Sequence, residues 1–232
     1  DKGDTLTTEI WFNTPDVEGT QVILSKGSAW KLALKKDGSY NKLVYHQNGA
    51  EVMVSDKSIS TNAWNHVSIV KTKKAAEKAE YRFYVNGSKI LFNTGKDVVE
   101  VATKAATSDA LLIGKDASGN FFRGNIDEFR IWGETRNANL ALRPDEIKDN
   151  VDSTVIKKYF NVYLPYRVGG KVAQPTLLHY NNMDVGSGNS ITNAVNQSLK
   201  GSLAGESDNS YWHVSDAPAY ASAFTDLEGA YE

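Results

Sequence analysis

The chain has 232 residues, of which 23% are charged and 41% hydrophobic, and its formal net charge is -2. No basic block could neutralise phosphates, so nucleic acid is excluded as a ligand class, and the apolar runs are far shorter than the ~20 residues of a membrane-spanning helix. The absence of cysteine excludes disulfides, thiolate metal sites and a cysteine nucleophile.

Short apolar stretches, separated by Gly, Asn, Asp and Ser, recur from residue 8 to Trp132 and predict β-strands. The predicted strands are Thr8–Asn13, Gln21–Ser25, Trp30–Leu34, Lys42–His46, Glu51–Ser55, His66–Lys71, Tyr81–Val85, Lys89–Asn93, Ala110–Gly114 and Ile126–Trp132. Many short strands at regular spacing predict an all-β fold, in which two antiparallel sheets pack as a jelly-roll sandwich.

The clearest hairpin lies near the middle of the chain. Tyr81–Val85 alternates as a half-buried antiparallel strand does, and Lys89–Phe92 returns. Asn86-Gly87 between them fits the two positive-φ positions of a type I′ turn. The preceding Lys73–Glu80 favours helix by composition but has no apolar stripe, so we expect a solvated excursion between two strands.

The C-terminal part breaks the strand pattern before it resumes. Asn139–Lys158 looks helical in part, because Pro144 fits a first helical position and Asp145 and Glu146 would lie near the positive helix end. Tyr159–Pro175, with Gly169-Gly170 and two prolines, is expected to be an extended connector. Three more strands are predicted, at Leu177–Asn181, Ser190–Ala194 and Lys200–Leu203.

The most informative segment is Gly124–Trp132, which reads Gly-Asn-Ile-Asp-Glu-Phe-Arg-Ile-Trp. It resembles the late strand of the laminin-G-like domains in the concanavalin-A-like lectin/glucanase superfamily, where a loop and a short acidic helix follow, here Asn139–Asn150. Five earlier segments occur in the family's order: Thr8–Phe12, Ile23–Gly27, Trp64–Val67, Phe83–Gly87 and Leu112–Gly114. The resemblance covers about residues 6–150 and implies a jelly-roll sandwich, which the strand pattern predicts independently.

The segments after residue 176 resemble the stretch that usually opens such a domain. They are Leu177–Asp184, Gly186–Gly188, Gly201–Leu203 and Trp212. Because a lone pair of strands cannot bury its apolar face, we expect residues 176–214 to complete the same sandwich rather than to begin a second copy. Residues 1–232 are then a single domain, with an inserted connector at 152–175 whose role is open.

Asp127 is the first candidate site residue. On a regular strand it shares a face with Phe129 and Ile131, which would point inward, and an inward carboxylate is costly unless it is paired, hydrogen-bonded or metal-bound. It is therefore either a structural acid that accepts backbone amides or a calcium ligand, since calcium prefers carboxylate and carbonyl oxygens. The family resemblance implies a structural calcium ion, with Asp184 as a second ligand.

The superfamily also contains glycoside hydrolases, whose retaining members need two carboxyl groups about 5 Å apart. The related glucanases provide them on one strand face as Glu-x-Asp-x-Glu, whereas the corresponding face here reads Asn125, Asp127 and Phe129. Glu128 is expected to point the other way. The four histidines lie in no catalytic motif: His46, His66, His179 and His213. The sequence therefore predicts no catalytic residues and no enzymatic activity.

Exposed aromatic side chains are the remaining candidates, because sugar rings stack on them. Trp30, after a Lys-Gly-Ser turn, and Tyr40, in the Asp37–Asn41 turn, are expected on the surface, as are Tyr163 and Tyr166 in the insertion. For each of them, a partly buried packing role is the alternative.

With the family resemblance, these features predict a non-catalytic binding or adhesion module of a secreted or cell-surface bacterial protein. Its expected partner is a carbohydrate or a cell-surface protein. A spacer domain without a ligand and a glycoside hydrolase are the alternatives.

Overall fold

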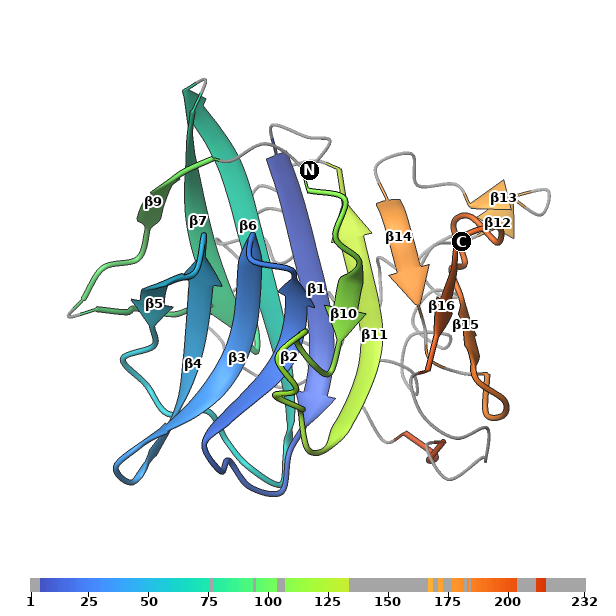
Figure 1. Cartoon of the computed structure of the whole chain (residues 1–232), viewed down its shortest axis with the longest axis horizontal. Coiled ribbons are helices and arrows are strands. Elements are labelled where there is room, and N and C mark those ends of the chain that lie inside the picture. Colours follow the sequence, from blue (N-terminus) through green and yellow to red (C-terminus); the bar gives the residue numbers. More distant parts are fainter. Residues whose placement is uncertain are drawn as a thin grey trace, which may run out of the picture.

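The computed structural model describes residues 5–75, 77–93, 95–103, 107–133, 167–168, 171–172, 177–181, 183, 185–203 and 212–215. Two antiparallel sheets pack as a sandwich (Figure 1), which confirms the predicted all-β fold. The described residues contain no helix, and therefore no helix long and apolar enough to cross a membrane. The helix predicted over Asn139–Lys158 lies outside the described residues, as does most of the connector.

The larger sheet has seven strands among the described residues, with β1 in its interior. In spatial order they are β14 (Leu177–Asn181), β11 (Asn125–Trp132), β1 (Thr5–Asn13), β6 (Trp64–Ala75), β7 (Lys78–Val85) and, both beside β7, β8 (Ser88–Lys89) and β9 (Val99–Ala102). The first strand of the chain thus pairs with β11, far along the sequence, and this long-range pairing joins β11 and β14 to the rest of the sheet.

The smaller sheet has five described strands, four of which follow one another along the chain. In spatial order they are β10 (Leu111–Ile113), β2 (Thr20–Lys26), β3 (Trp30–Asp37), β4 (Tyr40–Gln47) and β5 (Ala50–Val54). Asn48 and Gly49 join β4 to β5 with φ angles of 54° and 81°, as a type I′ turn requires. Two short hairpins lie apart from both sheets: β12 (Arg167–Val168) with β13 (Lys171–Val172), and β15 (Ser190–Thr192) with β16 (Lys200–Ser202).

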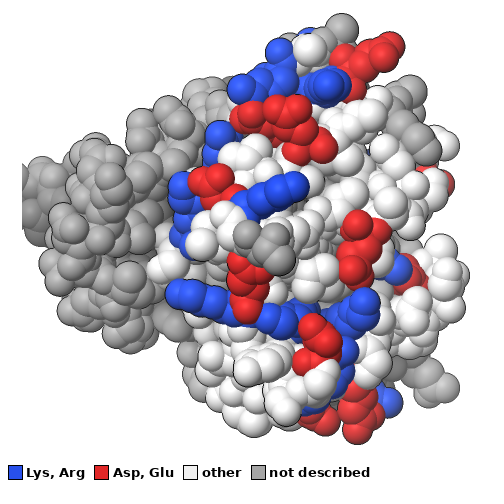
Figure 2. Space-filling model, turned by 90° about the vertical axis from the view of Figure 1, so that its left-hand side faces the viewer, with Lys and Arg blue, Asp and Glu red and all other residues white. Residues whose placement is uncertain are grey.

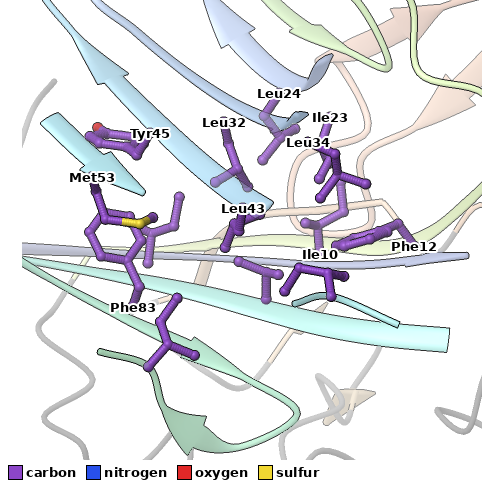
Figure 3. Close-up of a cluster of buried hydrophobic side chains, with 14 of the residues drawn as sticks. Ile10, Phe12, Ile23, Leu24, Leu32, Leu34, Leu43, Tyr45, Met53 and Phe83 are labelled. Carbon is purple, nitrogen blue, oxygen red and sulfur yellow. The ribbon is translucent and has the colours of Figure 1, made fainter. Parts of the chain in front are cut away.

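The hydrophobic core fills the space between the two sheets (Figure 3). Leu32, Leu34 and Leu43 enter it from the smaller sheet, and Ile10 and Phe12 enter it from β1; all five are at most 1% exposed. Each such side chain stabilises the fold by about 1.5–3 kcal/mol. Because side chains alternate along a strand, the residues between these positions must lie on the outer faces of the sandwich.

The hairpin of β6 and β7 differs from the sequence prediction. Lys73–Glu80 is not an excursion between strands, because β6 continues to Ala75 and β7 already begins at Lys78. Ala79 is fully buried. The small alanine side chains allow the two strands to continue past the core, so helix-favouring composition was the wrong signal here. The predicted return strand Lys89–Asn93 is also shorter, since β8 ends at Lys89.

The C-terminal strand β14 extends the larger sheet beside β11 (Figure 1). In this pairing Tyr180 lies opposite Arg130. The segment after β15 is attached to β14 by two bonds. The backbone N–H of Tyr180 donates to Asn193 Oδ1 at 3.1 Å, and the Ala194 N–H donates to the Tyr180 carbonyl at 2.8 Å. Residues from the C-terminal part therefore belong to the same sheet as β1, while the exact domain limits stay a prediction.

Candidate functional site

The outer side of the smaller sheet, which we call the open face, carries a row of small aliphatic side chains. Val22, Ala33, Val44 and Val54 lie in register across β2, β3, β4 and β5, and they form a cluster separate from the main core. The first three are fully buried although they lie on an outer side. Neighbouring side chains therefore cover this row, which we call the aliphatic floor; it packs beneath the open face, and its three fully buried members do not themselves contact solvent.

Charged side chains flank this floor. Lys31 Nζ lies 3.2 Å from Asp116 Oδ2, Lys35 Nζ lies 3.2 Å from Glu51 Oε2, and His46 Nε2 lies 3.9 Å from the same Glu51 oxygen. Burial lowers the pKa of His46, and the charge of Lys31 lowers it further, so the imidazole is neutral at pH 7. Charges of both signs also alternate over the edge of the sandwich shown in Figure 2, without a large single-sign patch.

The loop that follows β10 is ordered by Asp116. The Asp116 Oδ1 atom accepts the backbone N–H groups of Ser118 at 2.9 Å and Asn120 at 3.1 Å, and Oδ2 accepts the Asn120 amide at 2.9 Å. Burial alone would raise the pKa of Asp116, but the bonds from Asn120 and Lys31 lower it overall, so the carboxylate is charged. Ser25 Oγ donates to the Lys115 carbonyl at 2.8 Å, which fixes the loop beside the open face.

Two adjacent aromatic residues in this loop point in opposite directions. Phe122 packs against Phe12 in the core, with ring centroids 5.8 Å apart in an edge-on arrangement. Phe121 is 60% exposed, and Lys115 Nζ lies 6.0 Å from its ring centroid. Sequence reasoning missed Phe121; the signal was the paired phenylalanines after a glycine turn, of which an extended backbone can bury only one.

Tyr40 is the exposed aromatic residue at the other end of the open face. It is 60% exposed at the first position of β4, and Lys42 Nζ lies 5.1 Å from its ring centroid. The adjacent backbone is fixed: the Asn41 N–H donates to Ser58 Oγ at 3.0 Å, and the Asn41 carbonyl accepts the Ile59 N–H at 2.7 Å. The ring is therefore presented by ordered backbone rather than by a free loop.

The other predicted aromatic residues have different surroundings. Trp30, at the first position of β3, is half-buried, and its ring stacks on Tyr45 at 6.4 Å with 26° between the planes. Trp30 pairs with Gln47 and Tyr40 pairs with Asp37, so the two aromatics lie at opposite ends of the β3–β4 hairpin. They do not form one site. Tyr163 and Tyr166 lie outside the described residues.

Asp127 does not lie on the inward face, so the sequence prediction was wrong. Glu9 of β1 pairs with Arg130, whereas Trp11 pairs with Asp127, which leaves one extra residue in β11. This bulge lies at Glu128, whose φ angle is 53°, and it reverses the alternation of side chains before it. Asp127 is buried on the outer side of the larger sheet, where it accepts the Glu128 N–H at 2.8 Å and the Ser215 hydroxyl at 2.5 Å.

These contacts do not form the predicted calcium site. Asp184 lies outside the described residues, and within the described ranges no group of three or more His, Cys, Asp or Glu side chains could hold a metal ion. The hydrogen bonds to Asp127 match the other interpretation, a structural acid that accepts donors. Calcium binding stays a prediction.

The outer side of the larger sheet, which we call the buried face, carries a polar cluster that the sequence reasoning missed. Glu128 forms an ion pair with Arg130, two residues away, and accepts the hydroxyl of Tyr180 from the distant strand β14 at 2.9 Å. The Arg130 guanidinium also lies 5.0 Å from the Tyr180 ring centroid. Beside them, Trp132 Nε1 donates to Glu9 Oε2 at 3.1 Å. Acid and base two positions apart in the sequence were the available signal.

The buried face is built for stability rather than for ligand access. Burial lowers the pKa of Arg130, but the neighbouring Glu128 carboxylate raises it overall, so the guanidinium keeps its charge. Burial raises the pKa of Tyr180, which therefore stays a neutral donor. Arg130 and Glu128 are both 1% exposed. A cluster so enclosed links β11 to β14 and offers no surface to a polysaccharide.

Comparison with protein families places this sandwich in a known class. A laminin G family profile, described as concanavalin A-like lectin/glucanases superfamily, matches residues 1–140, which is more than half of the chain. The chain therefore belongs to this superfamily, as the resemblance of its ordered segments predicts. A comparison with curated proteins found no match.

Comparison with solved structures found several chains that are similar to this one. A candidate carbohydrate-binding protein from Bacteroides ovatus is 21% identical with a TM-score of 0.53; the match covers 82% of this chain and 49% of that protein, so this chain spans about half its length. Domain 4 of an extracellular arabinanase from Geobacillus stearothermophilus, bound to arabinotriose, is 16% identical (TM-score 0.43; 60% and 65% covered). A pentraxin from Limulus polyphemus is 17% identical (TM-score 0.40; 62% and 70% covered). At these identities the similarity concerns the fold.

Proposed function

We propose that this domain is a non-catalytic carbohydrate-binding module whose ligand lies on the open face. One observation carries the proposal: Tyr40 is 60% exposed on ordered backbone, on the same side of the sheet as the aliphatic floor and its flanking lysines. Carbohydrate sites combine an aromatic or apolar surface with a few fixed polar groups that orient the ligand. The carbohydrate-binding description of the Bacteroides ovatus protein supports the same class.

Preorganisation favours the open face over other surfaces. The backbone beside Tyr40 is held by the bonds of Asn41 to Ser58 and Ile59, so little backbone entropy is lost when a ligand stacks on the ring. The Lys42 ammonium group adds a donor over the ring, and it also bonds to the Asp56 carbonyl at 2.6 Å. Trp30, Tyr163 and Tyr166 remain proposed secondary contacts, and calcium through Asp127 and Asp184 remains a proposed structural cofactor.

The test is a glycan array with the purified domain, in calcium and in EDTA, followed by titration of the strongest binder. We expect Tyr40→Ala to reduce affinity about tenfold, which corresponds to the ~1.4 kcal/mol of a lost aromatic contact. Leu199→Ala is the matched control, because Leu199 is also exposed but belongs to the segment between β15 and β16. Binding to no glycan would favour the spacer interpretation.

We further propose that the module acts outside the cell, in a secreted or cell-surface bacterial protein, because large polysaccharides are met there. Fractionation of a producing bacterium with an antibody to the domain tests this. Recovery in the medium or at the cell surface is expected, and recovery in the cytosol alone would contradict it. Hydrolysis of a β-glucan by the pure domain, lost in Asp127→Asn, would overturn the non-catalytic assignment.

A further inference from the structure

We propose that the open face binds acidic polysaccharides, whose sugars carry carboxylate or sulfate groups, through two aromatic–lysine pairs at its two ends. One pair is Tyr40 with Lys42 and the other is Phe121 with Lys115. The inference rests on the proposed function, because it names the ligand class of the same face.

The two pairs have the same construction although they come from different parts of the chain. Each has a ring that is 60% exposed, and each has a lysine ammonium group within 5.1 or 6.0 Å of the ring centroid. Since each ammonium group lies over its ring, a sugar would stack on the part of the aromatic surface that the lysine leaves exposed, with its substituents within reach of the ammonium group. An acidic substituent gains a charge-assisted hydrogen bond there, which a hydroxyl group cannot match.

The charge balance of the open face separates its lysines into two kinds. Lys31 and Lys35 are each 3.2 Å from a carboxylate, so their charges are already compensated. Lys42 bonds to a backbone carbonyl, and Lys115 contacts only the ring; neither meets a carboxylate among the described residues. The uncompensated charges thus lie beside the exposed rings.

The separation of the two pairs predicts a chain rather than a single sugar. Tyr40 begins β4, and His46, six positions later, lies opposite Lys31, whose ammonium group meets the Asp116 loop. At about 3.3 Å per residue the two ends of the face are roughly 20 Å apart. The aliphatic floor lies between them. A polysaccharide that reaches both ends gains from the high effective concentration of its second contact.

The experiment compares each acidic polymer with its uncharged form by calorimetric titration of the intact chain. Polygalacturonate is measured against its methyl ester, and dextran sulfate against dextran, so that carboxylate and sulfate recognition are separated. We expect at least one acidic polymer to bind more than tenfold tighter than its neutral form, with affinity falling steeply as salt is raised. A trisaccharide of the same acid should bind at least tenfold more weakly than the polymer.

The variants locate the binding. Lys42→Met and Lys115→Met should each lower affinity about two- to fivefold, whereas Lys200→Met, the same charge change on exposed β16, should leave it unchanged. Tyr40→Ala and Phe121→Ala should weaken binding further. Equal binding of the acidic and neutral forms would overturn the inference but leave glycan binding intact. Equal binding of poly-glutamate and the acidic polymers would also overturn it, because the face would then recognise acidic peptides as well. Binding of no polymer at all would overturn the proposed function as well.

Discussion

The two outer faces of this sandwich hold similar types of residue under different conditions. On the buried face, Arg130 and Glu128 form an ion pair whose side chains are 2% and 1% exposed. On the open face, Lys31 and Asp116 form an ion pair whose side chains are 26% and 9% exposed. A charged pair therefore cannot be assigned to stability or to binding from its residue types alone, because solvent access decides what the pair contributes.

The largest effect is expected from breaking the buried pair. In Arg130→Met the Glu128 carboxylate loses its cation while it stays enclosed with Tyr180, and an uncompensated buried charge costs about 3–5 kcal/mol of unfolding free energy. Urea unfolding measures the loss. The double variant Glu128→Gln with Arg130→Met should recover part of it, since position 128 is then neutral, while the buried Glu9 opposite position 130 keeps only the Trp132 N–H as its donor among the described residues. A loss below about 1 kcal/mol in the single variant would contradict the enclosure of this face.

A second large effect is expected at Gly124, which precedes β11. Its φ angle is 146°, and an added Cβ would lie 2.1 Å from the Asn13 carbonyl oxygen, which is backbone and cannot move aside. Gly124→Ala should therefore cost about 3 kcal/mol in the same urea measurement. Gly119→Ala is the control in the open-face loop, because its φ is 86° but nothing lies within 4 Å; it should cost about 1 kcal/mol. Equal losses would show that backbone conformation alone decides both.

The sandwich itself was predictable from the sequence because each strand has a local sequence pattern. Alternation, turn residues and the order of the family-like segments all survive in the structure. The direction of Asp127 was not predictable, because it depends on one extra residue at Glu128 that appears only in the pairing with β1. A single inserted residue reverses a face without changing the hydrophobic pattern that suggested the strand.

The residues of the two outer faces divide in the same way. Tyr40 was predictable, because a tyrosine beside a two-residue turn is poorly placed to enter the core, and it is exposed. The hydrogen bond between Tyr180 and Glu128 was not predictable, because the two residues meet only where β14 pairs with β11. The exposure of Phe121 had a local signal in the paired phenylalanines, but its position beside the open face depends on the contact of the Asp116 loop with β2, two distant segments. Local sequence signals therefore predict the exposure of side chains in hairpins, but they do not predict contacts between distant strands.

A smaller, pH-dependent effect should separate the histidines of the two faces. Burial lowers the pKa of His66 well below 6.5, the nearby Arg130 lowers it further, and the ring lies 5.2 Å from Trp11. Just below pH 6.5, His66 therefore binds a proton in the unfolded chain but stays neutral in the folded chain. The stability from His66 is present above about pH 6.5 and falls by about 1.4 kcal/mol per pH unit as the pH drops toward the folded-state value.

Unfolding free energies at pH 7.5 and pH 5 measure this effect. His66→Gln should remove most of the acid-induced loss, whereas His46→Gln on the open face should remove little, because His46 is only partly buried and Glu51 opposes part of its pKa shift. His179, whose pKa burial also lowers, contributes with the same sign in both variants. An unchanged pH dependence in His66→Gln would contradict the enclosure of the buried face.

The smallest effect is expected from the open-face ion pair. Lys31→Met removes the cation beside Asp116, but Ser118 and Asn120 still donate to that carboxylate and solvent reaches the site. The loss should stay below about 1 kcal/mol and shrink further in 1 M salt, where exposed charges are screened. Urea unfolding at low and high salt measures it, with Arg130→Met as the reference. If Lys31→Met cost as much as Arg130→Met, the open face would be a second enclosed layer, and its lysines and rings would be unavailable to any polysaccharide.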